Sequence, residues 1–458
     1  MAVKKDLTYG NAKKLLLTFA LPFLLSNLVQ ALYNLTDTLI VSIWLNKEGV
    51  AATASGGQVL TVLINVASGL SLGGTIVIGR MFGAKDSKNL PQAIGSFLTL
   101  LSGLGAVTSV LLIIFARNVL TMINTPPEVL DDSVAFLRIY CTGVFFMFIY
   151  NAIIAVLRGV GNSARPLMFV AAGAAVNVAL DLVFIAGMGM GVTSAAVATS
   201  ISIFISCTLS VIYLFRQRRE LGLKREHFKP DWQLVLRILK VGLPSAVQSF
   251  VFGVSMLTIS SIINEYGVAA TATVGFGARI NDFTLMPLGA LSSATSGMVA
   301  QALGAAKLDR VKEIMRWSLT YHIISGIFLF SLVQLFPGFF IGIFSQEQEV
   351  LELGITYLRC VSFNYLFIMV LSACNALAAG AGHTLYCLCV TVMNAFAFRI
   401  PIALFFTNVM NAGIAGAFLG LGFANIGGMF AGIAYYRIGL WKRSINKIPH
   451  ESGLADIA

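Results

Sequence analysis

Two carboxylates inside long apolar segments are the residues of this sequence best suited to bind a cation or carry a proton. Asp37 and Asp181 both lie in runs that are otherwise apolar, where a charged side chain costs several kcal/mol unless it is paired or hydrated. Asn177 precedes Asp181 by one helical turn and shares its helix face, and Thr199 lies in the following run. Carboxylate, amide and hydroxyl oxygens are ligands that suit Na⁺, and a desolvated carboxyl is suited to carrying a proton.

The direction of the runs brings these four residues to one depth. The first and fifth runs lead outward and the sixth leads inward, so Asp37, Asp181 and Thr199 are all expected at the outer level of the N-terminal half. We therefore interpret the four residues as a cation-coupling site for H⁺ or Na⁺. The alternative is a structural polar network that only satisfies buried groups.

A second polar group lies in the C-terminal half of the chain. Arg279 and Asp282 are three residues apart in the eighth run, a spacing that lets their side chains meet on a helix. We interpret them as a pair that holds this half together, in preference to a second ion site. Arg399, in the eleventh run, is a candidate third member.

The segments that contain these residues are expected to be membrane-spanning helices. Of 458 residues, 57% are hydrophobic and 11% are charged, against about 25% charged in a soluble domain, and the mean hydropathy is +0.85. The apolar runs are long enough to cross ~30 Å of hydrocarbon as helices. The sequence therefore predicts an all-α polytopic membrane protein. Its twelve expected spans are 15–45, 52–79, 93–116, 133–157, 166–187, 192–215, 236–263, 268–300, 315–342, 351–379, 384–407 and 412–438.

The net charge of +11 comes mainly from connections on one side of the membrane. Of the 31 Lys and Arg residues, 25 fall in the connections assigned to that side, and only Lys47 and Arg117 fall in those of the other side. This is the positive-inside asymmetry. It predicts a multi-pass protein of the cell (plasma) membrane with both termini cytoplasmic, and it accounts for the charge without a nucleic-acid partner.

The chain also repeats itself at an offset of about 221 residues. Each half has six spans, so both halves begin on the cytoplasmic side and are related by a pseudo-two-fold axis along the membrane normal. We expect an N-lobe at 1–225 and a C-lobe at 226–458, the latter with a short cytoplasmic tail, facing each other across a cavity. The matching segments are Leu21-Pro22 with Leu243-Pro244, GVAATA at 49–54 and at 267–272, Gly83–Asp86 with Gly304–Asp309, and Gly159-x-Gly161 with Gly380-x-Gly382.

The sequence carries no convincing enzyme motif. Gly69-Leu-Ser71-Leu-Gly73 fits G-x-S-x-G, but it lies in the middle of an expected helix, without the strand-to-helix turn that exposes such a serine. The nucleotide-binding G-x-x-x-x-G-K-[ST] and the metalloprotease H-E-x-x-H do not occur. The six cysteines lie in apolar runs, as expected of free buried thiols. We expect neither an enzyme nor a cofactor, and transport driven by an ion gradient.

Three stretches resemble the multidrug and toxic compound extrusion (MATE) transporters. They are LPFLLSNLVQALYNLTDTLIV in the first span, RGVGNSARP after the fourth span and RINDFTLMPLGAL in the eighth. The resemblance covers about residues 10–440. It implies secondary, cation-coupled export of bulky, often cationic and lipophilic small molecules by alternating access, with the substrate between the lobes. We expect a monomer in the lipid bilayer.

One branch of that family has its cation site in the N-lobe, and this chain resembles it. In that branch an acid on the first span acts with Asn-x-x-x-Asp on the fifth and a Thr on the sixth. The corresponding residues here are Asp37, Asn177, Asp181 and Thr199, the same four that the depth argument selects. Asn151, on the fourth span, is a weaker match because we place it deeper than the others.

The resemblance also assigns residues to the substrate cavity or to a hinge. Pro22 matches the proline of the family's first span, where its missing helix hydrogen bond permits either a moving hinge or a static kink. Tyr33 and Asn34 lie a turn from Asp37 and face similar surroundings. Another branch of the family uses acids in the seventh and tenth spans. This chain departs from it, because its tenth span has no acid and Glu265 lies at a membrane edge.

The alternative function is a flippase for a lipid-linked or polysaccharide precursor, whose families have related lobes. Such proteins often have more spans and several cationic residues in the cavity that hold pyrophosphate. Here only four arginines lie within spans, and three of them lie towards the outer ends. The sequence therefore favours a cation-coupled exporter.

Overall fold

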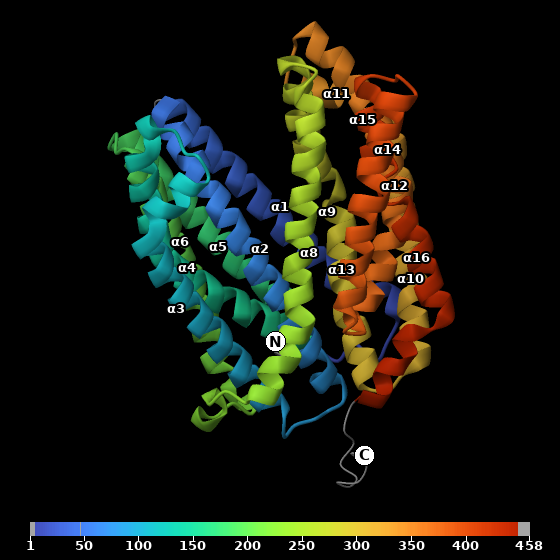
Figure 1. Cartoon of the computed structure of the whole chain (residues 1–458). Coiled ribbons are helices and arrows are strands. Elements are labelled where there is room, and N and C mark those ends of the chain that lie inside the picture. Colours follow the sequence, from blue (N-terminus) through green and yellow to red (C-terminus); the bar gives the residue numbers. More distant parts are fainter. Residues whose placement is uncertain (1–4, 46, 448–458) are drawn as a thin grey trace.

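The computed structural model describes residues 5–45 and 47–447, and within them the chain forms helices and no strands. The expected C-terminal tail, from residue 448, lies outside the described residues. Two helix bundles stand side by side (Figure 1). The first contains α1 (Ala12–Trp44), α2 (Lys47–Gly83), α3 (Leu90–Met122), α4 (Pro127–Gly159), α5 (Ala164–Asp181), the π-helical η1 (Leu182–Gly187) and α6 (Val192–Arg216).

A short helical connection, α7 (Arg218–Leu221) and the 3₁₀ turn η2 (Arg225–Phe228), leads to the second bundle. Two π-helical segments, η3 and η4, interrupt its eleventh span. The bundle contains α8 (Trp232–Asn264), α9 (Val268–Gly304), α10 (Leu308–Leu335), α11 (Pro337–Gly342), α12 (Gln348–Gly380), α13 (Thr384–Met393), η3 (Asn394–Arg399), α14 (Ile400–Leu404), η4 (Phe405–Val409), α15 (Ile414–Gly422), α16 (Ile426–Ile438) and the 3₁₀ segment η5 (Leu440–Lys447).

The predicted all-α membrane fold is confirmed. Within the described ranges, eleven helical segments are long and apolar enough to cross a bilayer. The remaining expected span corresponds to α9, which has 37 residues but a less apolar sequence that includes Arg279, Asn281 and Asp282. Helix α9 packs against helices of both bundles, so its polar side chains need not face lipid.

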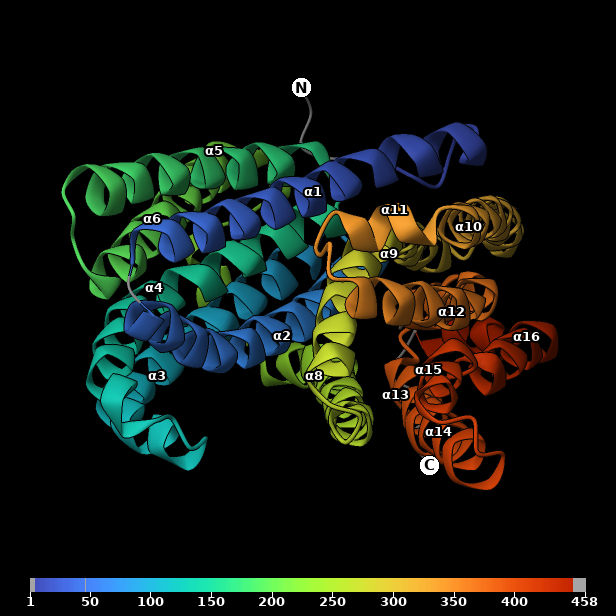
Figure 2. The same cartoon turned by 90° about the horizontal axis from the view of Figure 1, so that it is seen from above.

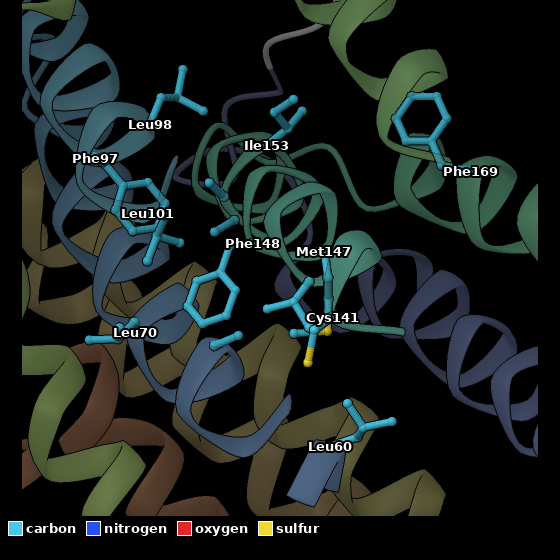
Figure 3. Packing of buried hydrophobic residues seen from close by; sticks show 14 of the residues in the cluster. Leu60, Leu70, Phe97, Leu98, Leu101, Cys141, Met147, Phe148, Ile153 and Phe169 are labelled. Carbon is cyan, nitrogen blue, oxygen red and sulfur yellow. The ribbon is translucent and has the colours of Figure 1, made fainter. Parts of the chain in front are cut away.

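Small residues let the helices of the first bundle approach closely. Figure 3 shows the aromatic rings of Phe97 and Phe148 within a cluster of buried side chains. A Cβ on Gly74 would overlap the Phe97 ring, and a Cβ on Gly105 would lie 2.7 Å from Phe148 Cβ. Because lipid tails are as apolar as these side chains, close packing of this kind is a main source of helix association in a membrane.

The two bundles meet tightly near the end of the molecule opposite α11 (Figure 1). A Cβ on Gly83 would overlap the backbone of Gln301, and a Cβ on Gly304 would overlap the backbone of Arg80. Arg80 and Gln301 are 221 residues apart, as are Gly83 and Gly304. The contact is therefore reciprocal, as it must be where two equivalent surfaces meet across a two-fold axis.

Hydrogen bonds reinforce this junction. The buried Gln301 side chain donates from Nε2 to the carbonyl of Gly159 in the first bundle (2.8 Å) and accepts from the backbone N–H of Leu7 (3.0 Å). Towards the opposite end, the bundles lean apart (Figure 1). The junction therefore closes the space between the bundles at the end opposite α11.

A methyl group placed at the junction should destabilise the closed arrangement. We expect Gly83→Ala to cost about 1–3 kcal/mol, because the added Cβ meets backbone atoms that cannot rotate away. Thermal unfolding of the purified protein in detergent measures the effect. Gly103→Ala is the matched control, since a Cβ there meets nothing within 4 Å. Equal midpoints for the two variants would contradict the reciprocal contact.

Candidate cation site and interlobe cavity

The predicted cation site lies where α1, α5 and α6 pack together (Figure 2). Helix α5 ends at Asp181, and its next turn is the π-helical η1. A π-turn is a rare distortion of an α-helix that occurs frequently at functional sites. Here it follows directly after the carboxylate that the sequence singles out.

Asp181 belongs to a buried hydrogen-bonded group. Asp181 and Asn177 are fully buried and Thr199 is nearly so. The Asn177 amide nitrogen donates to Asp181 Oδ2 (2.7 Å), and its oxygen lies 3.2 Å from the hydroxyl of Thr199. The spacing of one helical turn between Asn177 and Asp181 lets the amide fix one carboxylate oxygen. The other oxygen, Oδ1, has no hydrogen-bond partner in the described protein.

Asp37 completes the group from α1. Its half-buried carboxyl lies within hydrogen-bonding reach of the Asp181 carboxyl, and its own Oδ1 is also without a partner in the described part of the chain. Two carboxylates at this separation repel each other unless a proton or a metal cation lies between them. The geometry can therefore hold one positive charge, as H⁺ or as a cation with oxygen ligands.

Two tyrosines surround this carboxyl pair. Tyr33, one turn before Asp37 on α1, approaches the Thr199 hydroxyl. The family resemblance assigns Tyr33 to the substrate cavity or to a hinge. In the structure its side chain lies beside the carboxyl pair. Tyr140, on α4, lies close enough to Asp37 for their charges to interact. Nothing in the sequence distinguishes Tyr140 from the other aromatic residues of its span, so only the packing of α4 against α2 and α6 reveals it.

Three other predicted residues lie away from the pair. Asn151 donates from Nδ2 to the Met147 carbonyl of its own helix (2.9 Å) and is not part of the hydrogen-bonded group of Asn177, Asp181 and Thr199. Asn34 is exposed. Pro22 stands inside a continuous α1 and borders a separate cavity of about 900 Å³ between α1, the start of α5 and α9.

The expected pair of Arg279 and Asp282 is not an ion pair in this structure. Both side chains are exposed, and the ion pairs of the described residues include neither of them. Their charges do interact over a longer distance. An exposed pair would add little stability, so the fold does not depend on pairing these two side chains. Arg399 does not join them but hydrogen-bonds Ser255 (3.0 Å).

A second polar region is a cavity of about 620 Å³ between the bundles. Figure 2 shows α2 of the first bundle beside α8 of the second, with α13 on the far side of α8. Most of the lining comes from the second bundle and is rich in amides and hydroxyls. The lining residues are Thr61, Asn65, Gln248, Ser249, Phe252, Asp282, Ile368, Leu371, Ser372, Asn375, Thr391, Asn394, Arg399 and Asn425.

Hydrogen bonds organise the amides of this wall. Asn394 donates to Asn425 (2.9 Å), and Asn425 donates to Asn364 (2.8 Å). Gln248 of α8 donates to the Thr391 hydroxyl of α13 (2.9 Å). Sequence reasoning missed these residues. Uncharged amides inside apolar runs could have indicated them. This indication is weaker than that of a carboxylate, because transfer of an amide into hydrocarbon has a smaller free-energy cost.

Comparisons with known proteins agree with the two-bundle organisation. The family model MatE matches the chain twice, at residues 22–183 and 244–405. The chain is 29% identical to the probable multidrug resistance protein YoeA of Bacillus subtilis (strain 168), over 93% of each chain. It is 26% identical to the probable multidrug resistance protein NorM of Thermotoga maritima, over 94% of this chain and 93% of that protein.

A solved structure has the same fold. It is described as the outward-facing conformation of a multidrug resistance MATE family transporter of the MOP superfamily. The TM-score is 0.90 at 22% sequence identity, and the alignment covers 97% of this chain and 98% of that one.

The Thr199 hydroxyl is expected to stabilise the protein through the buried Asn177 amide. Thr199→Val removes the hydroxyl beside the amide oxygen without changing side-chain size. We expect a loss of about 0.5–1.5 kcal/mol, because the amide oxygen loses one of its two donors and keeps only the backbone N–H of Thr199. Thr199→Ser, which keeps the hydroxyl, should lose less. Thermal unfolding of both purified variants checks this. A serine variant as unstable as the valine variant would show that the hydroxyl contributes nothing.

Proposed function

This chain is a multi-pass membrane transporter of the MatE family, and we propose that it is a cation-coupled antiporter. It exports bulky, often cationic and lipophilic compounds by alternating access, driven by inward flow of H⁺ or Na⁺. Asp37, Asn177, Asp181 and Thr199 bind the driving ion. The cavity between the bundles receives the exported compound.

The carboxyl pair of Asp37 and Asp181 is the observation that carries this proposal. An ion-driven pump needs a group whose charge state changes during its cycle, because only a state-dependent interaction shifts a conformational equilibrium. The two carboxyls come from different helices, α1 and α5. Binding or release of one cation between them would therefore change the attraction between these helices.

The junction at the end opposite α11 supports alternating access. It closes the space between the bundles at Gly83 and Gln301, while the interlobe cavity lies beyond it, bordered by Asn65 and Asn375. Rocking of two repeated bundles about a central site is the general means by which such transporters expose that site to each side in turn. Opening towards the cytoplasm requires this junction to separate.

The charge distribution supports a cell-membrane location with cytoplasmic termini. Most Lys and Arg residues lie in connections on one side, which in polytopic proteins is the cytoplasmic side. The first and last described segments hydrogen-bond equivalent connections of the two halves, Lys5 to Val160 after α4 and Ser444 to Ala381 after α12, so both lie on the same side.

Labelling of single cysteines tests this orientation. In a variant without the six native cysteines, a cysteine at the exposed position Asp132 should react with a membrane-impermeant maleimide added to intact cells, and one at the exposed position Lys224 should not. After the cells are broken, both should react. Reaction at Lys224 in intact cells would contradict the proposed orientation.

Neutral amides at the two carboxyls test the coupling. Asp37→Asn and Asp181→Asn keep the side-chain shape but remove the charge that alternates, so efflux of ethidium from proteoliposomes under an imposed pH or Na⁺ gradient should fall to the rate of protein-free vesicles. The matched control is Asp132→Asn, an exposed carboxylate far along the chain from either site, which should transport as the unmodified protein does. Gradient-driven efflux by folded Asp37→Asn at the unmodified rate would overturn this assignment of the coupling site.

A further inference from the structure

Arg399 is a buried cation with no counter-ion among the described residues. Only 5% of its surface is exposed. Its Nη1 donates to the Ser255 hydroxyl (3.0 Å), and its guanidinium lies 5.0 Å from the centre of the Phe252 ring. Its Nε has no hydrogen-bond partner, and no carboxylate of the described residues forms an ion pair with it. An uncompensated buried charge is strongly unfavourable for stability. The presence of Arg399 at this position therefore indicates a function other than stabilising the fold.

The π-helical segment η3 brings Arg399 to the interlobe cavity. It runs from Asn394 to Arg399, and both of these residues line the cavity. In an α-helix, residues five apart point about 140° away from each other. In a π-helix, the hydrogen bonds join residues five apart, so such residues lie on one face. The local distortion is therefore what directs the guanidinium and the Asn394 amide to the same space.

The same cavity also contains a negative charge. Asp282, on α9, lines it, is exposed and forms no ion pair with described residues. Phe252, Ile368 and Leu371 supply apolar surface in the same cavity. A volume of about 620 Å³ lies within the range of sites for drug-sized molecules, which typically combine apolar walls with a few fixed polar groups.

We propose that this cavity binds zwitterionic organic molecules, with their carboxylate held by Arg399 and their cationic group facing Asp282. The planar guanidinium offers its free N–H donors to a carboxylate, which is the strongest pairing available to it. Phe252 orients the guanidinium from one side and Ser255 from another. As a substrate class for the proposed exporter, this assignment rests on the proposed function, whereas binding itself can be measured without transport.

Two dyes that differ only in a carboxylate test the proposal. Rhodamine B carries a free carboxylate beside its cationic ring system, and rhodamine B ethyl ester carries the same ring system with the carboxylate blocked. Fluorescence polarisation of each dye with the purified full chain in detergent, corrected for protein-free micelles, should show about tenfold or tighter binding of rhodamine B. Arg399→Gln should abolish this preference by weakening rhodamine B alone, and Arg399→Lys should keep part of it.

Three further variants separate this role from others. Ser255→Ala removes the hydrogen bond to Arg399 but leaves its charge, so it should keep most of the preference for the carboxylate. Asp282→Asn should weaken both dyes alike, because both carry the cation. Asp132→Asn, at an exposed residue that does not line the cavity, should bind both dyes as the unmodified protein does. Because binding is measured without a gradient, a failed coupling experiment would leave this result intact.

The outcomes are distinguishable. Equal affinity of the unmodified protein for the two dyes would overturn the proposal. Equal weakening of both dyes in Arg399→Gln, or the same loss in Ser255→Ala, would show that Arg399 only joins η3 to α8. Selective loss of rhodamine B binding in Arg399→Gln, with Ser255→Ala unaffected, would establish the carboxylate site even if no gradient drives export.

Discussion

The structure depends on one constraint, which is the absence of water in the hydrocarbon that surrounds it. Every backbone polar group must then be satisfied within a helix, and every polar side chain must find a partner or a hydrated space. Helix α9 illustrates the consequence. It is the long helix with the most polar centre, and it lies against both bundles instead of facing lipid on all sides. Its Asp282 side chain reaches the interlobe cavity.

The same constraint separates the polar side chains into two regions with different properties. The carboxyl pair of Asp37 and Asp181 lies inside the first bundle and suits a small cation, because its ligands are closely spaced oxygens. The interlobe cavity is larger and has apolar walls, so it suits an organic molecule. The pair and the cavity share no residue in the described protein. Coupling between an ion and an exported compound would therefore act through movement of helices, as two sites that bias one conformational equilibrium.

Close backbone contacts determine where that movement can occur. Where Gly83 meets Gln301 and Gly304 meets Arg80, the bundles touch through glycines and main chain. Such a surface has few side chains that must rearrange when it separates, and its reciprocal form follows from the sequence repeat. Gln301 adds hydrogen bonds to both the first bundle and the N-terminal segment. The junction is thus specific, since both its close contacts and its hydrogen bonds depend on particular residues.

The sequence predicted the spans, the repeat and the expected depth of the polar residues, because helix length and direction can be read along the chain. Depth alone brought Asn177, Asp181 and Thr199 to one level, and the structure places them in one hydrogen-bonded group. The rotation and lateral packing of the helices decide which helix faces meet. Both depend on contacts between segments that are distant in the sequence. For this reason only the tertiary structure shows that Tyr140 lies beside Asp37. Only the tertiary structure shows that Arg399 is buried with no counter-ion among the described residues.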